Sequence, residues 1–193
     1  AGSVFDTAVL DGVSARFAGG HIDTNANGIA VDSLHGLLAC FECRSEWHAA
    51  DPFNGHRFVS GNSTTMLTVR CSSDRTGETG ASRNVWTVHE NMFGMDVASV
   101  FRGSAGGAIH NIATSRAFFA GTVVGRDRGD VGMGGIIRPT AIRASNSAVI
   151  YLDGVTIDMT ASTFDLYTES GAYIYTRNMR PSRNANVGNV LPF

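Results

Sequence analysis

The chain has 193 residues, which is enough for one domain with a substantial core. It contains 23 glycines but only 4 prolines, and 17% of its residues are charged, a combination typical of a turn-rich all-β protein. A net charge of −2 gives no electrostatic basis for binding nucleic acid. No apolar run approaches the ~20 residues that span a bilayer. We therefore expect neither a nucleic-acid partner nor membrane insertion.

Short strands separated by turns are predicted through the first two thirds of the chain. The strands are expected at Gly28–Val31, Leu37–Arg44, Met66–Cys71, Asn84–Val88, Asp96–Phe101, Ala108–Ile112 and Phe118–Val124. Two polar segments, Ser72–Arg83 and Gly125–Gly135, are expected to be exposed excursions, because long polar connections usually run over the surface. No segment predicts a helix of three turns.

The segment from Gly135 to Thr176 is the most regular part of the sequence. Apolar and polar residues alternate there in runs of about five, a pattern that places alternate side chains on opposite faces of a strand. The predicted strands are Thr140–Ala144, Ala148–Leu152, Val155–Met159, Phe164–Tyr167 and Ala172–Thr176. The turns between them are Ser145–Ser147, Asp153–Gly154, Thr160–Thr163 and Glu169–Gly171. These turns are too short for a crossover helix.

Two all-β architectures are compatible with this spacing, and the sequence favours a parallel β-helix. The corners are built from Ser-Asn-Ser, Asp-Gly and Ser-Gly, which bend the chain without reversing it. The residues expected to point inward are β-branched and suited to stacking in a solenoid. They are Ile142, Val149, Val155, Ile157 and Ile174. The alternative is an antiparallel β-sandwich, which also has short, evenly spaced strands.

Several runs have the texture of one known group of β-helices. Gly61–Thr65 (Gly-Asn-Ser-Thr-Thr) followed by Leu67–Cys71 (Leu-Thr-Val-Arg-Cys) resembles the asparagine–threonine, strand, cysteine rungs of phage-borne right-handed β-helices. Gly106–Ile109 and Ser147–Ile150 resemble later rungs of the same kind. These rungs belong to tail spikes, tail fibres and pectate-lyase-like depolymerases. The glycine- and aspartate-rich entry segment of that family is missing here.

This resemblance implies a right-handed parallel β-helix in residues 1–177, followed by a C-terminal extension or cap in residues 178–193. We expect the chain to begin inside the fold. The resemblance also implies a homotrimer that works with other virion tail proteins, on the virion tail or outside the cell, and contacts a bacterial surface polysaccharide. The first functional hypothesis is thus a structural and receptor-binding part of a tail spike or tail fibre. One alternative is a polysaccharide depolymerase, and another is a secreted cellular carbohydrate-binding domain.

A depolymerase would need carboxylates and a sugar platform. Glycoside hydrolysis uses two carboxylates roughly 5–10 Å apart, and a lyase uses a base with a group that neutralises a uronate. Two clusters combine acids, an imidazole and an indole, and from them we select catalytic candidates. These are Glu46, Asp51, His89 and Glu90. The structural alternative is that they are ordinary corner residues.

Carbohydrate-binding candidates are aromatic or basic. Trp47 and Trp86 accompany the two acidic clusters, and Arg75 and Arg83 lie in a polar segment of the kind that carries specificity in β-helices. Tyr151, Tyr167, Tyr173 and Tyr175 are further candidates for stacking on sugars. Tyr173 and Tyr175 share a face by their period of two, and a stripe of this kind favours an interface between subunits.

No cofactor or metal is expected. Cys40-x-x-Cys43, with His48, His56 and Cys71, has the outline of a zinc site. Residues three apart on a strand face opposite sides, however, so the cysteines are predicted to be small core residues instead. The Arg-Gly-Asp sequence at Arg128–Asp130 is expected to belong to a solvated charged loop.

Overall fold

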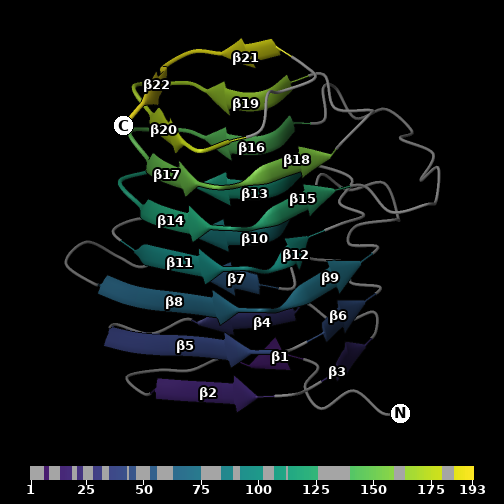
Figure 1. The fold of residues 1–193 in the computed structure, drawn as a ribbon. Coiled ribbons are helices and arrows are strands. Elements are labelled where there is room, and N and C mark those ends of the chain that lie inside the picture. The colour runs from purple at the N-terminus through teal and green to yellow at the C-terminus, as the bar shows by residue number, and fades with distance from the viewer. Residues whose placement is uncertain are drawn as a thin grey trace, which may run out of the picture.

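Short strands joined by tight corners wind around one axis in the computed structural model of the chain (Figure 1). The structure describes residues 7–8, 14–18, 21–23, 28–31, 35–42, 44–46, 53–55, 63–74, 84–88, 92–101, 107–111, 113–125, 140–158, 164–179 and 185–193. Every regular element among them is a strand. The composition is consistent with this, because abundant glycine and sparse charge favour turns and buried strands.

Three sheets form the walls of the coil. The first contains β1 (Thr7–Ala8), β4 (Gly28–Val31), β7 (Phe53–Gly55), β10 (Asn84–Val88), β13 (Gly107–Asn111), β16 (Thr140–Ala144), β19 (Phe164–Thr168) and β21 (Ala185–Val187). The second contains β2 (Ser14–Ala18), β5 (His35–Phe41), β8 (Ser63–Val69), β11 (Phe93–Val97), β14 (Arg116–Ala120), β17 (Val149–Asp153), β20 (Tyr173–Arg177) and β22 (Val190–Pro192). The third contains β3 (His21–Asp23), β6 (Arg44–Glu46), β9 (Ser72–Asp74), β12 (Val100–Phe101), β15 (Val123–Gly125) and β18 (Thr156–Asp158).

The chain visits the three sheets in turn, and every strand pairs in parallel with the equivalent strand of the next coil. For example, β10, β11 and β12 lie in successive sheets, and β13 then returns to pair with β10. In Figure 1 the front strands run to the right and the rear strands to the left as the chain climbs, which makes the coil right-handed. The predicted right-handed parallel β-helix is confirmed. The antiparallel sandwich is wrong, since no described pair is antiparallel.

A single residue in the left-handed region forms each described corner between the second and third sheets. These residues have φ between 50° and 62°, and they are Glu42, Arg70, Ala98, Gly121 and Gly154. Their backbone N–H groups bond upward to the next coil: Arg70 N donates to Val97 O at 2.9 Å, and Ala98 N donates to Ala120 O at 2.8 Å. The corners therefore extend the parallel hydrogen-bond ladder around the bend instead of interrupting it.

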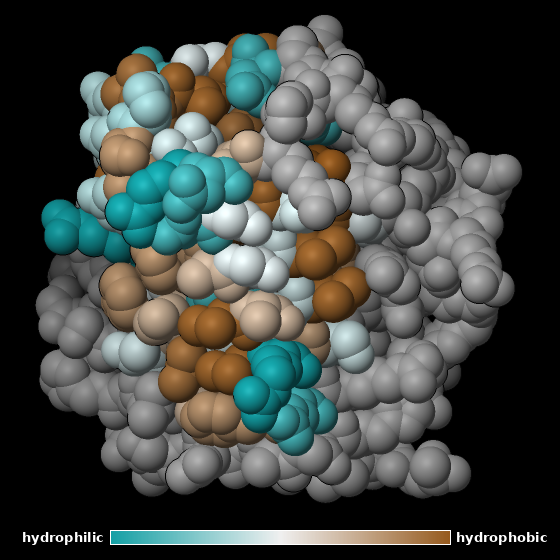
Figure 2. Space-filling view, viewed as in Figure 1, coloured by the Kyte–Doolittle hydropathy of each residue, from teal (hydrophilic) through white to brown (hydrophobic). Residues whose placement is uncertain are grey.

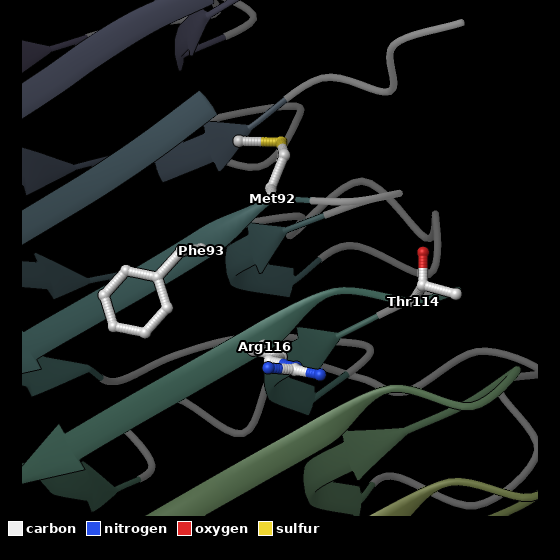
Figure 3. A pocket seen from close by; sticks show the side chains of 4 residues that line it. All are labelled: Met92, Phe93, Thr114 and Arg116. Carbon is white, nitrogen blue, oxygen red and sulfur yellow. The ribbon is translucent and has the colours of Figure 1, made fainter. Parts of the chain in front are cut away.

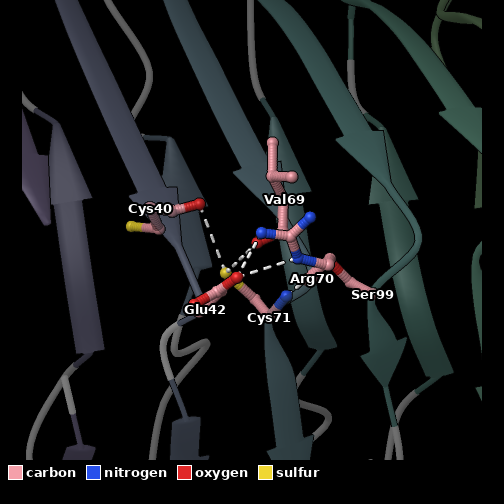
Figure 4. A network of polar contacts seen from close by, with 6 residues as sticks. All are labelled: Cys40, Glu42, Val69, Arg70, Cys71 and Ser99. Atoms are coloured by element: carbon pink, nitrogen blue, oxygen red, sulfur yellow. Dashed lines mark hydrogen bonds and ion pairs between the residues drawn. The ribbon is translucent and has the colours of Figure 1, made fainter. Parts of the chain in front are cut away.

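Stacking also joins the side chains of neighbouring corners (Figure 4). Outside, the Arg70 guanidinium forms an ion pair with Glu42, one coil below. Inside, the Cys71 thiol donates to Cys40 O at 3.3 Å, and Cys71 N donates to Ser99 Oγ at 3.0 Å. Cys40 and Cys71 are buried, so the prediction that they are small core residues is confirmed for both. Cys43, His48 and His56 lie outside the described residues.

Vertical columns of buried side chains fill the coil. Trp86, Ile109, Ile142 and Leu166 occupy equivalent places on four successive strands of the first sheet, and each is at most 1% exposed. In the second sheet, Ile150 lies beneath Ile174, and both are fully buried. Because a parallel register places like upon like, one inward column continues through several coils.

The inward positions were predicted correctly for Ile142, Val155 and Ile174, whereas Ile157 is only partly buried. The prediction for Val149 was wrong, because Ala148, Ile150 and Leu152 point inward and leave Val149 on the outer face. The Asn146–Ser147 corner determines which residues of the strand point inward, because Ala148, the first residue after it, is buried in the core.

Two polar or irregular segments contribute strands. The expected excursion Ser72–Arg83 begins with β9, which pairs with β6 and β12 through its backbone, and its remaining residues lie outside the described ones. Residues 178–193 were expected to form an extension or cap. Within them, β21 pairs with β19 and β22 pairs with β20, so each adds a strand to a sheet. The rest of the segment Gly125–Gly135 and the turn Thr160–Thr163 lie outside the described part of the chain.

Candidate functional site

The outward face of the second sheet carries the exposed apolar side chains. Five large hydrophobic side chains are more than a third exposed among the described residues, and all five belong to this sheet or to the residue that follows it. They are Phe93 (45%), Tyr151 (36%), Tyr173 (39%), Leu191 (42%) and Phe193 (43%). In Figure 2 apolar and weakly polar side chains gather over the front strands. An apolar concentration of this kind on one face marks an interaction surface.

Strand parity and register create this face. Along β17, for example, Ile150 and Leu152 point into the core, so Tyr151 must point outward. The parallel register then places Tyr175 of β20 directly above Tyr151, and Tyr173 above Val149. The outward columns thus follow from the same alternation that fills the core.

Four aromatic rings on this face form one cluster, which we call the tyrosine cluster: Tyr151, Tyr173, Tyr175 and Phe193. The rings of Tyr151 and Tyr175 stack with centroids 5.2 Å apart and planes at 14°. Tyr173 stacks beside Tyr175 at 6.2 Å, and Phe193 meets Tyr151 edge-on at 5.6 Å. Tyr151, Tyr173 and Phe193 are partly exposed, and three of the four rings carry a hydroxyl, a mixture that suits partners with both apolar and hydroxylated surfaces.

An ion pair, a hydrogen bond and a cation–π contact hold one edge of the tyrosine cluster. Arg177 Nη2 donates to Asp153 Oδ2 at 2.5 Å, and Asn178 Nδ2 donates to Asp153 Oδ1 at 2.9 Å. These bonds, the one from Arg177 first, lower the pKa of the exposed Asp153 carboxyl. The Arg177 guanidinium also lies 4.9 Å from the centre of the Phe193 ring. Asp153 is therefore an ionised structural partner.

A depression lies lower on the same sheet, where β11 and β14 begin (Figure 3). It encloses about 410 Å³ and is lined by Met92, Phe93, Thr114 and Arg116. Met92 is buried, whereas the other three side chains are exposed. Phe93 and Arg116 occupy paired positions on neighbouring strands, so both project outward at the rim.

A polar cluster lies in the core behind this face. The carboxylate of Asp96 is fully buried and accepts hydrogen bonds from the hydroxyls of Thr68, at 2.5 Å, and Thr122. Ser99 donates to it as well, through its hydroxyl and its backbone N–H. Burial raises the pKa of the Asp96 carboxyl above its usual value, and the hydrogen bonds from Ser99, Thr122 and Thr68 oppose that rise.

Trp86 belongs to the same buried network. Its indole N–H donates to Thr68 Oγ1 at 3.2 Å, and its ring meets Phe119 edge-on at 4.7 Å between centroids. Trp86 was proposed from the sequence as a sugar-stacking residue. In the structure it is 0% exposed and offers no ring face to a saccharide, so it takes no part in the site proposed below.

The other residues selected from the sequence are not brought together by the described part of the structure. Glu46 ends β6, in the third sheet, and its side chain is not described. Trp47, Asp51, Arg75, Arg83, His89 and Glu90 lie outside the described residues. Tyr167 lies on the first sheet, where it is half-buried and 5.9 Å from the Arg143 guanidinium. Tyr151, Tyr173 and Tyr175 do share one face.

Sequence reasoning missed Phe93, Arg116 and the buried Asp96. Phe93 precedes a stretch whose apolar residues, Met95 and Val97, point outward while Gly94 and Asp96 point inward. Ordinary hydrophobic alternation predicts the opposite parity here. A usable signal was the isolated arginine before Ala117–Ala120, because a cation at the start of an apolar strand marks an outward position.

The arrangement is suited to binding. On the described outer face of β11, β14, β17 and β20, Asp153 is the only side-chain carboxylate, and it is paired with Arg177. No group of three or more metal-ligating side chains occurs within the described ranges, and no helix in them is long and apolar enough to cross a membrane. No protein-family model, curated protein or solved structure matches the chain.

Proposed function

We propose that this chain is a structural and receptor-binding segment of a phage tail spike or tail fibre, and that it contacts a bacterial surface polysaccharide through the outward face of its second sheet. The observation that carries the proposal is that, among the residues whose side chains the structure describes, the five exposed large hydrophobic ones gather on that face. The solenoid supports them on a stiff wall, because β11, β17 and β20 are each held by a neighbour on either side and β22 is held by β20.

A saccharide suits this face better than a second copy of the chain. Pyranose rings have apolar C–H faces and a rim of hydroxyls, which match aromatic rings that carry phenolic groups. The cores of protein–protein interfaces are depleted in Lys, Glu and Asp, and the arginines that are enriched there need a partner for their charge. Arg116 lies within this face, and no acidic partner for it is found in the part of the chain that the structure describes. Burying such a guanidinium against another subunit costs several kcal/mol when that subunit brings no acid to it.

We further propose that the segment works as a homotrimer outside the cell, alongside other virion tail proteins, and that the subunits associate through a surface other than this face. The support is the sequence resemblance to tail-spike rungs together with the parallel solenoid. Light scattering is expected to give three times the mass of one chain. A folded monomer at micromolar concentration argues against the tail-spike setting, because closed threefold symmetry holds such appendages together.

The binding test uses purified bacterial surface polysaccharides. We expect the wild-type chain to bind at least one of them and to release no shorter product. We expect the Tyr151→Ala/Tyr175→Ala variant to bind about 30-fold more weakly, because each lost ring contact is worth ~1 kcal/mol. Tyr167→Ala, on the first sheet, is the matched control and should bind as the wild type does. Equal binding by the double variant contradicts the proposal, and release of shortened polysaccharide favours the depolymerase alternative.

A further inference from the structure

We propose that the depression at Phe93 and Arg116 is a subsite for a carboxylated sugar, so that the polysaccharide recognised is an acidic one containing uronic acid residues. This inference rests on the proposed function, since it assumes that the outward face of the second sheet binds saccharide. It adds the chemical class of the ligand and the residue that selects it.

The charge of Arg116 carries the first step. The other described arginines with described side chains each pair with an acid: Arg70 with Glu42, Arg143 with Glu169 and Arg177 with Asp153. Arg116 has no such pair within the described ranges. Its strand neighbours in the outward column are Phe93 and Val149, both apolar. An exposed guanidinium set among apolar groups attracts an anion, and its planar fork matches a carboxylate in bidentate geometry.

The depression supplies shape and a second type of contact. Its volume of about 410 Å³ lies in the range of small-ligand sites and accommodates a single sugar ring. Phe93 is 45% exposed and borders the space beside Arg116. A pyranose ring lying against Phe93 brings its carboxylate towards Arg116. An apolar and a charged contact to a uronic acid residue are therefore available at one place.

The subsite is continuous with the rest of the face. The outward column that contains Phe93 and Arg116 continues through Val149 to Tyr173, which belongs to the tyrosine cluster. A chain of sugars that follows this column contacts the acidic subsite at one end and the aromatic rings at the other. The tyrosine cluster thus contributes affinity for any polysaccharide, and Arg116 contributes selection for acidic ones. Mutations can therefore test the two contributions separately.

The test compares uronate-containing polymers with neutral ones. The probes are hyaluronan, heparosan and alginate, each paired with its carboxyl-reduced derivative, together with dextran as an unrelated neutral polymer. We expect the wild type to bind at least one acidic polymer about tenfold more tightly than the reduced partner, as befits one charge-assisted contact. We expect Arg116→Gln to weaken binding of the acidic polymer about tenfold, so that the acidic and the reduced polymer bind with similar affinity.

Arg70→Gln is the matched control, because it removes the same charge from another exposed arginine, at a corner away from the depression. It should keep the preference for acidic polymers, and circular dichroism should show both variants folded. The inference is overturned if Arg116→Gln keeps the preference or if the wild type binds acidic and reduced polymers equally. In both cases binding itself still supports the proposed function. Failure of the wild type to bind any polysaccharide overturns both.

Discussion

Replacing Asp96 by alanine is expected to lower the free energy of unfolding by about 4 kcal/mol. Asp96 is fully buried, and the hydroxyls of Thr68, Ser99 and Thr122 donate to it. Alanine removes their common acceptor and leaves a cavity, and each buried donor without a partner costs ~1–3 kcal/mol. Because Thr68 also accepts from the indole of Trp86, the damage extends to the first sheet.

Asp96→Asn is the matched control, since it keeps the shape and one acceptor oxygen. The neighbouring hydroxyls can rotate to accept from its amide, so we expect a loss of only ~1 kcal/mol. Urea denaturation followed by circular dichroism measures both variants. Equal stability of Asp96→Ala and the wild type contradicts the assigned role of this network.

The difference in stability between the wild type and Asp96→Asn should depend on pH, because the pKa of Asp96 is raised in the folded state. Between the unfolded value of 3.8 and the higher folded value, the folded state binds the proton more tightly than the unfolded state. The stability contributed by this proton is therefore fully present below 3.8 and is lost as the pH rises through the folded pKa. We expect the wild type to gain stability relative to Asp96→Asn as the pH is lowered towards 3.8. A relative loss contradicts the direction of the shift.

Replacing Gly188 by alanine is expected to open the uppermost described coil. Gly188 has φ of 90°, and a Cβ atom there comes within 2.1 Å of Thr168 Oγ1 and 2.5 Å of Thr168 O. The same Thr168 hydroxyl accepts from Asn189 N at 2.6 Å, so the clash also breaks a bond that holds the strand. Strain and overpacking together cost about 3 kcal/mol.

The effect should be local, because coils of a solenoid contact mainly their neighbours. Native-state hydrogen exchange is expected to show about 100-fold less protection in β21 and β22. Gly121→Ala is the matched control: φ is 62°, but nothing lies within 4 Å of the added Cβ. It should cost about 1 kcal/mol and leave exchange in β21 and β22 unchanged. Unchanged protection in Gly188→Ala contradicts the close contact with Thr168.

The regular part of the fold was predictable because each strand there carries apolar residues between short polar corners. Strands Gly28–Val31, Asn84–Val88 and Thr140–Ala144 were predicted with the bounds that the structure gives. The strand β9 was not predicted as such, since Ser72–Asp74 is entirely polar and shows no apolar pattern. The third-sheet strands from β6 onward follow a corner residue in the left-handed region and are only two or three residues long, so they show little alternation of apolar and polar side chains.

The site was less predictable, because it depends on parity and register. The stretch Ala-Val-Ile-Tyr-Leu at 148–152 is apolar on both faces, so its sequence alone does not show which face is buried. The corner before it decides that Val149 and Tyr151 point outward. The inward position of Asp96 depends on Thr68 and Thr122, which lie 28 and 26 residues away in sequence. Trp86 was expected at the surface on account of its neighbours in sequence, whereas the column above it, beginning with Ile109, places it in the core.

The most direct test of the central claim is hydroxyl-radical footprinting of the wild-type chain with and without a bound polysaccharide. We predict that oxidation of Phe93, Tyr151 and Tyr173, which are exposed on the second sheet, falls when the polysaccharide binds. Tyr167, on the first sheet, should be oxidised equally in both samples. Binding that leaves the three residues as reactive as before contradicts the assignment of this face. So does protection that is already complete before any polysaccharide is added, because it means that another subunit covers the face.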